Sequence, residues 1–244
     1  MPASASRSLS VELRDAVALV TLNRPDKRNA LSIELRFAVG EEFARLSASD
    51  DVACVVLTGA GSAFCAGMDV TQFGGDEDNR LRLYESSVAC FRAVGSCAKP
   101  VIAALNGPAV AGGFALALLC DVRLASSNAV VGFLETRRGI PASYASARRA
   151  LPAALAIELS LSGRVLDARE ALALGIVSAV HDGEELLDRA LEYAAGLASQ
   201  PRWMLLETKR RILLDAEASV GALAAQEDRA LRGALLTPRV DPAA

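Results

Sequence analysis

Two glycines that open a predicted helix are the first residues whose type and spacing could do chemistry. An apolar strand, Pro100 to Leu105, leads into Asn106-Gly107, and Ala111-Gly112-Gly113 then starts the helix. Small residues let a ligand approach the main chain, and the first amides of a helix have no intrahelical acceptor. Such amides, aimed at a carbonyl, would stabilise the negative charge of an enolate. Close packing of a helix on a sheet is the alternative explanation.

A second loop could present another main-chain amide. It reads Ala63-Phe64-Cys65-Ala66-Gly67-Met68-Asp69 and follows an apolar strand, Val52 to Thr58. Its centre again consists of small residues, which leave room for a ligand beside the backbone.

Histidine and cysteine usage excludes several other chemistries. The only histidine, His181, lies in a turn-like stretch, and there is no G-x-S-x-G motif, so a serine or cysteine triad is not predicted. The five cysteines have no metal-ligand spacing, so no metal site is predicted and free thiols in a reducing compartment are expected. Acid–base work must therefore fall to carboxylates, tyrosine or lysine.

The composition suits one large globular domain. Apolar residues make up 52% of 244 residues, and the net charge of -3 argues against a nucleic-acid partner. The richest apolar run, Val101 to Leu119, is interrupted by Asn106-Gly107-Pro108 and Gly112-Gly113, so no membrane span is predicted. No secretory signal is recognisable at Met1 to Ser10, and a cytoplasmic location is expected.

The elements that must position these loops alternate between strand and helix. Strands are predicted at 11–13, 17–22, 52–58, 100–105, 121–125 and 176–180; helices are predicted at 32–47, 81–94, 112–119, 144–150, 153–160 and 168–174. Beyond Glu184 the chain is predicted to be helical, with Pro201 starting one helix and another running from Ala218 to Leu235. The pattern predicts an α/β fold with a helical end.

Four ordered segments resemble the crotonase family, also called the enoyl-CoA hydratase/isomerase superfamily. They are Asn23-Arg24-Pro25 with Asn29-Ala30-Leu31; Ala63 to Asp69; Ile102 to Val122; and Gly163-Arg164 with Ala168 to Val177. The resemblance implies a crotonase-like (ClpP/crotonase) spiral of repeated ββα units. It places a core with an acyl-CoA site in residues 1–185 and a helical oligomerisation region in residues 186–244, with assembly into a homotrimer or hexamer.

The same resemblance assigns roles to residues. The amides of Met68 and Gly112 would form an oxyanion hole for the thioester carbonyl. Coenzyme A would be bound by Lys27, Arg28, Ala30, Ala66, Met68, Asp69, Val70, Gly112, Gly113 and Lys209, with the cations Lys27, Arg28 and Lys209 near its phosphates. The thioester is the substrate, and no separate cofactor is implied.

The acidic residues distinguish the reactions of the family. Its hydratases use two glutamates; the first position is Ala115 here, and the second is Glu135. One carboxylate suits transfer of a proton from beside the thioester to another carbon, as in enoyl-CoA isomerases. The alternatives are an enoyl-CoA hydratase proper (a lyase), a non-catalytic acyl-CoA-binding protein, and thioester hydrolysis or carbon–carbon cleavage on the same site. Glu135 could also be structural, held by loop amides or by Arg137 and Arg138.

Ser143 and Tyr144 differ from the glycine-rich run that hydratases carry after the equivalent of Pro141. Ser143 is predicted to cap a helix, with Tyr144 packed at its edge. Alternatively, their hydroxyls could orient a polar acyl group. Candidates for lining the acyl pocket are Phe73, Leu83, Tyr84, Val110, Phe133, Leu134 and Tyr144.

Overall fold

The computed structural model describes residues 8–236, and a six-stranded sheet forms its centre. In order across the sheet, the strands are β1 (Leu9–Arg14), β2 (Val17–Leu22), β3 (Cys54–Gly59), β4 (Val101–Leu105), β6 (Val122–Ser126) and β9 (Ala179–His181). β1 and β2 are antiparallel, and every later pair is parallel. Parallel neighbours need crossover connections, which the helices supply. The predicted α/β class is confirmed.

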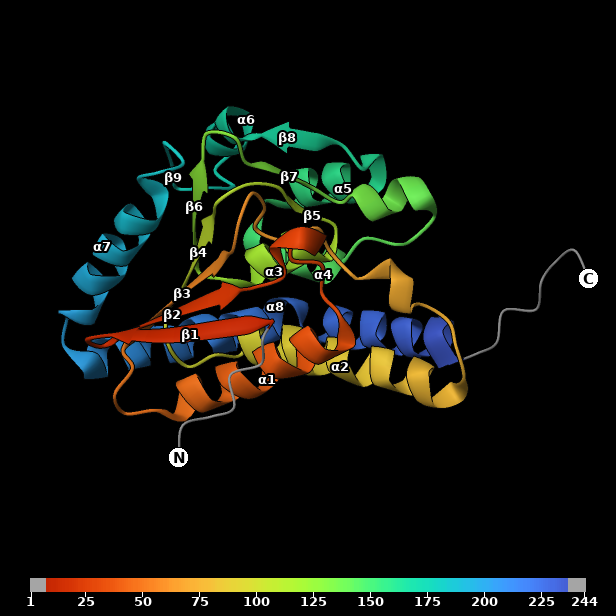
Figure 1. The fold of residues 1–244 in the computed structure, drawn as a ribbon, viewed down its shortest axis with the longest axis horizontal. Coiled ribbons are helices and arrows are strands. Elements are labelled where there is room, and N and C mark those ends of the chain that lie inside the picture. The colour runs from red at the N-terminus through yellow and green to blue at the C-terminus, as the bar shows by residue number, and fades with distance from the viewer. Residues whose placement is uncertain (1–7, 237–244) are drawn as a thin grey trace, which may run out of the picture.

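Alternate residues of the strands face two separate cores. Along β2, Ala18 and Val20 join the core under α1 (Ile33–Ala48) and α2 (Glu77–Gly95), whereas Val17 and Leu19 face α7 (Leu186–Ala198). Figure 1 shows α7 on one side of the sheet and the α1–α2 pair on the other. Both faces of the central strands are therefore buried, which explains their continuous apolar sequences.

A second, three-stranded sheet brings the functional loops together. β5 (Ala109–Val110) runs parallel to β7 (Val130–Gly132), and β8 (Val165–Asp167) is antiparallel to β7. The chain passes from β4 to β5 to α3 (Gly112–Leu119), and from β6 to β7 to α4 (Tyr144–Ala150). These successive strand–strand–helix units agree with the predicted spiral.

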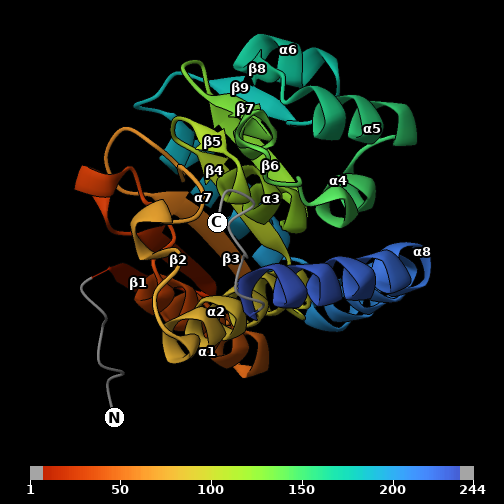
Figure 2. The ribbon, with the colours of Figure 1, turned by 90° about the vertical axis from the view of Figure 1, so that its right-hand side faces the viewer.

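The C-terminal region differs from its prediction in one respect. α5 (Ala153–Ser162) and α6 (Ala168–Ala173) lie near their predicted positions, but α8 is one helix of 35 residues, Arg202–Leu236. The prediction of a second helix starting at Ala218 is wrong, because no proline falls inside this span and strong helix formers dominate it. Figure 2 shows α8 running alongside α2 and below α4.

The last strand also differs from its prediction. β9 covers Ala179–His181, whereas Ile176 and Val177 are buried residues ahead of it. His181 is the final residue of β9, opposite Ser126 of β6, so the interpretation of its surroundings as a turn-like stretch is wrong.

Residues 8–236 contain no membrane-spanning helix, no disulfide and no cluster of metal-ligating side chains. No helix of residues 8–236 is both long and apolar enough to cross a membrane. All five cysteines are buried free thiols. In that same range, no three His, Cys, Asp or Glu side chains gather as a metal site would require.

Candidate active site

The two glycine-containing loops predicted from the sequence lie against each other. The Cys65 amide donates to the Pro108 carbonyl at 3.1 Å, and the Val110 amide donates to the Cys65 carbonyl at 3.0 Å. A Cβ on Gly113 would lie 2.2 Å from the Cys65 oxygen, and one on Gly67 would lie 2.8 Å from the Ala111 Cβ. Glycine is therefore required at both positions by the close approach of the two backbones.

The Met68 and Gly112 amides are neighbours at this junction. A Cβ built on Gly112 would lie 3.6 Å from the Met68 nitrogen. As the first residue of α3, Gly112 has no intrahelical acceptor. Neither amide donates a hydrogen bond within the part of the chain that the structure describes. The two predicted N–H groups are thus adjacent and available to one acceptor.

Ala111 is held in an unusual conformation just before these amides. Its φ of 53° and ψ of -131° suit glycine, and such a conformation costs roughly 1–3 kcal/mol. Its amide donates to the Gly132 carbonyl at 2.8 Å, which fixes the turn to the end of β7. Backbone strain is therefore concentrated where the chain turns into α3.

Glu135 lies beyond the end of β7, in a short 3₁₀ helix, Leu134–Arg138. Because β5 and β7 are parallel, the residues that follow them leave the small sheet at the same edge. The rings of Phe114 and Phe133, 4.9 Å apart, pack the start of α3 against the segment that leads to Glu135. The fold therefore brings Gly112 and Glu135 to one edge, although they are distant in sequence.

The Glu135 carboxyl has an environment that favours its protonated form. Its Oε2 atom is buried and has no hydrogen-bond partner. Burial raises the pKa of Glu135 to about 7, with its own backbone amide acting in the opposite direction. Neither Arg137 nor Arg138 forms an ion pair with it in the described structure, so the alternative of an arginine-bound structural carboxylate is not supported.

The first hydratase position offers no acid. Ala115 is buried in α3, and no residue of that helix is acidic. A carboxylate that no sequence pattern indicated lies at the start of α4. Glu227 of α8 accepts from the Ala145 amide at 2.8 Å and from the Ser143 hydroxyl at 3.3 Å. Burial raises the pKa of Glu227.

This contact corrects the prediction for Ser143. It occupies the N-cap position of α4, but its side chain makes no capping hydrogen bond. Its Oγ instead lies 2.8 Å from the Ser146 Oγ, and Glu227 caps the helix. Tyr144 packs against the core as predicted. The cap comes from 82 residues away, so no local pattern could have indicated it.

The predicted coenzyme A segments are also brought together. The Ala66 amide donates to the Arg28 carbonyl at 2.9 Å, and the Leu31 amide donates to the Gly67 carbonyl at 2.8 Å. Arg24 binds both the Ala30 carbonyl and the Asp69 carboxylate. Asp69 also accepts from the Thr71 hydroxyl at 2.6 Å, so its side chain holds the loops together. The side chains of Lys27, Arg28 and Val70 are exposed beside this junction.

Lys209 is placed elsewhere, which corrects its prediction. It is 2% exposed, and its ammonium pairs with the Asp121 carboxylate at 2.5 and 2.6 Å. Asp121 also accepts from the Val101 amide at 2.8 Å. A buried ammonium that is already paired is not presented to a phosphate. Its role is to fasten α8 to the start of β4 and β6.

Replacing Lys209 by methionine should destabilise the fold by about 3 kcal/mol, because Asp121 would keep its charge without a partner. Chemical denaturation would measure the loss. Arg210→Met, which removes an exposed cation from the neighbouring position, is the control and should change stability by less than about 0.5 kcal/mol. Equal stability of the two variants would contradict the anchoring role.

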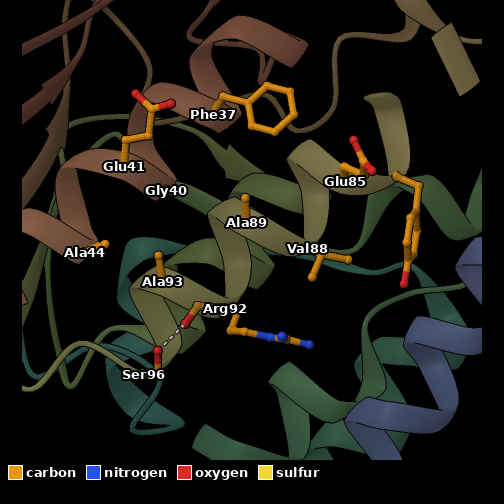
Figure 3. Close-up of a pocket in the computed structure, with 11 residues that line it drawn as sticks. Phe37, Gly40, Glu41, Ala44, Glu85, Val88, Ala89, Arg92, Ala93 and Ser96 are labelled. Atoms are coloured by element: carbon orange, nitrogen blue, oxygen red, sulfur yellow. Dashed lines mark hydrogen bonds between the residues drawn. The ribbon is translucent and has the colours of Figure 1, made fainter. Parts of the chain in front are cut away.

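The candidates for lining the acyl pocket fall into different environments. Leu83 and Phe133 are fully buried core residues, whereas Phe73 is exposed. The Tyr84 hydroxyl donates to the Asp228 carboxylate at 2.9 Å, and Arg232 lies over its ring. Tyr84 also borders a separate hollow of about 560 Å³ between α1 and α2, which Figure 3 shows with Phe37, Val88 and Arg92. This hollow contains none of the predicted catalytic or coenzyme A residues.

Known proteins with similar sequences and structures support one family. The enoyl-CoA hydratase/isomerase family model matches residues 12–234. A putative enoyl-CoA hydratase of Thermus thermophilus is 39% identical over 205 residues, covering 81% of this chain and 80% of that protein.

Two solved structures extend the comparison. An enoyl-CoA hydratase/isomerase from Mycobacterium paratuberculosis superposes with a TM-score of 0.88 at 27% identity, covering 96% of both chains. A monofunctional enoyl-CoA isomerase from M. smegmatis gives a TM-score of 0.72 at 34% identity, covering 87% of this chain and 95% of that one. The chain belongs to the enoyl-CoA hydratase/isomerase family, the crotonase family of the sequence prediction.

Proposed function

We propose that this member of the family is an enoyl-CoA isomerase that moves a double bond by proton transfer through Glu135. The observation that carries the proposal is the single buried carboxylate oxygen of Glu135, which has no partner, together with alanine at position 115. A carboxylate with a pKa near neutrality can both take and return a proton at physiological pH.

The Met68 and Gly112 amides would bind the thioester oxygen. Their adjacency and their lack of acceptors support this role. Two fixed N–H groups at the start of a helix stabilise developing negative charge without reorganising. The strained turn at Ala111 helps to hold one of them in place.

The proposed reaction balances as one proton removed and one returned. The Glu135 carboxylate takes a proton from the carbon beside the thioester carbonyl of a 3-enoyl-CoA. The C–H electron pair moves toward the carbonyl, whose oxygen becomes an enolate bound by the two amides. The protonated Glu135 then delivers the proton to the far end of the original double bond, and a 2-enoyl-CoA forms.

Coenzyme A is proposed to lie along Arg28, Ala30, Ala66 and Val70, with Lys27 and Arg28 near its phosphates. The main-chain bonds that join these segments and the exposure of both cations support this placement. Asp69 and Gly113 would shape the junction rather than bind the ligand with side chains. Trimeric or hexameric assembly and a cytoplasmic location stay predictions.

Hydration is the second candidate function. It is favoured by the name of the Thermus thermophilus relative, a putative enoyl-CoA hydratase. In this chain, hydration would need Glu135 to activate water without the second glutamate. Because alanine replaces that glutamate at position 115, isomerisation needs fewer groups than hydration does in this chain.

Paired substrates test the proposal. Purified protein should convert 3-enoyl-CoA to conjugated 2-enoyl-CoA, whose absorbance rises, and deuterium placed on the carbon beside the thioester carbonyl should reappear at the far end of the original double bond. It should leave 2-enoyl-CoA of the same length unhydrated. Water addition without double-bond migration would identify a hydratase, and binding without either reaction would identify an acyl-CoA-binding protein.

A further inference from the structure

Arg36 is a buried cation with no role in the proton transfer proposed above. It lies on α1 and is 1% exposed. In the described part of the chain it forms no ion pair with any carboxylate. Burial lowers the pKa of Arg36 to about 10, so the guanidinium is still charged at neutral pH. Burying a charge without a counterion is costly, and such groups are concentrated at functional sites.

The contacts of Arg36 direct this charge toward the loop that carries the Met68 amide. One terminal nitrogen, Nη1, lies 3.2 Å from the Met68 sulfur and 2.6 Å from the Ser87 hydroxyl oxygen. Nε donates to the Ser32 carbonyl at 3.4 Å. Every one of these acceptors is neutral, so none cancels the positive charge.

Two carboxylates, Glu34 and Asp69, attract the Arg36 guanidinium, but neither forms an ion pair with it in the described part of the chain. Asp69, one residue beyond Met68, is already paired with Arg24 at 2.9 Å. The helix α3, which begins at Gly112, contains no acidic residue. The guanidinium is therefore a buried positive charge in direct contact with the side chain of Met68, a residue of the proposed oxyanion hole.

We infer that Arg36 is a positioning residue: it holds Met68 and supplies a buried positive charge that stabilises the enolate formed at the Met68 and Gly112 amides. This inference rests on the proposed function. In a low-dielectric interior, such a charge acts over longer distances than it does in water. Proton removal neutralises Glu135 and moves its negative charge onto the thioester oxygen, so Arg36 favours the transition state over the bound substrate.

Three variants separate charge from packing. Arg36→Met removes the charge and keeps an unbranched side chain, whereas Arg36→Lys keeps the charge. Arg45→Met removes an exposed cation from the same helix and is the control. We expect Arg36→Met to lower kcat about tenfold or more with KM little changed, and Arg36→Lys to recover most of the loss. The melting temperature of Arg36→Met should stay level or rise, because an unpaired buried charge is removed.

A spectroscopic measurement tests the inference without turnover. Bound cinnamoyl-CoA should absorb at longer wavelength than free cinnamoyl-CoA, because the amides and Arg36 polarise its carbonyl. Arg36→Met should reduce this shift, and Arg36→Lys and Arg45→Met should preserve it. An unchanged shift in Arg36→Met, or equal losses of activity and melting temperature in the methionine and lysine variants, would overturn the role of Arg36.

The two proposals can fail separately. If the protein hydrates its substrate, the isomerase assignment fails while the cinnamoyl-CoA shift still reports on Arg36. If the protein isomerises normally and Arg36→Met matches the unchanged protein, only the role of Arg36 fails. If cinnamoyl-CoA and enoyl-CoA do not bind at all, both are overturned.

Discussion

Replacing Glu135 by glutamine should lower the rate of double-bond migration by about 10²–10⁴-fold, the usual contribution of a positioned general base. Glutamine keeps the size of the side chain and cannot take the proton. KM should change little, because coenzyme A contacts supply most of the binding. Steady-state kinetics on 3-enoyl-CoA would measure both the rate and KM.

The raised pKa of Glu135 also predicts how the activity changes with pH. Only the carboxylate form of Glu135 can accept a proton, so kcat/KM of the unchanged protein should rise with pH and level off above about 7. The glutamine variant should lack this rise. Glu192→Gln, which alters an exposed carboxylate on α7, is the control and should keep it. A rise that survived in the Glu135 variant would exclude Glu135 as the titrating base.

Glu135→Gln should lower activity but raise the stability of the fold at neutral and higher pH. Burial holds the pKa of folded Glu135 at about 7, above its ordinary 4.5. The folded protein therefore binds more protons than the unfolded chain across this window, and its stability falls as pH rises through it. The penalty is absent below 4.5 and complete above 7, where it reaches at most about 3 kcal/mol. Glu135→Gln should escape it, which denaturation at pH 8 would reveal.

Replacing Gly112 by alanine should lower activity by about 10²–10³-fold, comparable to losing one oxyanion donor. The added methyl would lie 3.6 Å from the Met68 nitrogen and 3.5 Å from the Met68 Cγ. It therefore fits at van der Waals contact but takes up space beside both amides. The fold should persist, because alanine is favourable in a helix. Kinetics and thermal denaturation of the same sample would separate these effects.

Gly113→Ala is the matched comparison on the adjacent residue. Its methyl would lie 2.2 Å from the Cys65 oxygen, so the two loops would have to separate. This variant should lose folded protein, whereas Gly112→Ala should lose turnover in a folded protein. Full activity in folded Gly112→Ala would contradict the prediction that the thioester oxygen occupies the space beside the Gly112 amide that the methyl would fill.

Local patterns were sufficient for the elements that carry the main-chain groups. Ser32 begins α1 as predicted, with its hydroxyl accepting from the Leu35 amide, and α3 covers the predicted residues. The resemblance also pointed to Glu135 and Ala115; the structure buries both Ala115 and the Oε2 atom of Glu135. These features depend on short stretches of sequence, where capping and glycine spacing have direct physical meaning.

Long-range pairings could not be predicted in the same way. Lys209 meets Asp121 across 88 residues, and a cation on a helical pattern gives no sign that it will be buried. Glu227 and Arg36 similarly contact residues that are distant in sequence. Glu227 accepts from the Ala145 amide, and Arg36 contacts the Ser87 hydroxyl. β5, β7 and β8 are only two or three residues long, too short for alternation to reveal them.

The position of α8 has a consequence for the order in which the chain can fold. During synthesis, Asp121 and the start of α4 emerge well before Lys209 and Glu227, the side chains that complete them. Until α8 follows, a nascent chain holds a carboxylate at the base of β6 with no ammonium beside it. The sheet can form early, but the ion pair between Lys209 and Asp121 can form only after α8 has been synthesised. Ribosome-bound chains ending before α8 should therefore be more open to proteases than the released protein.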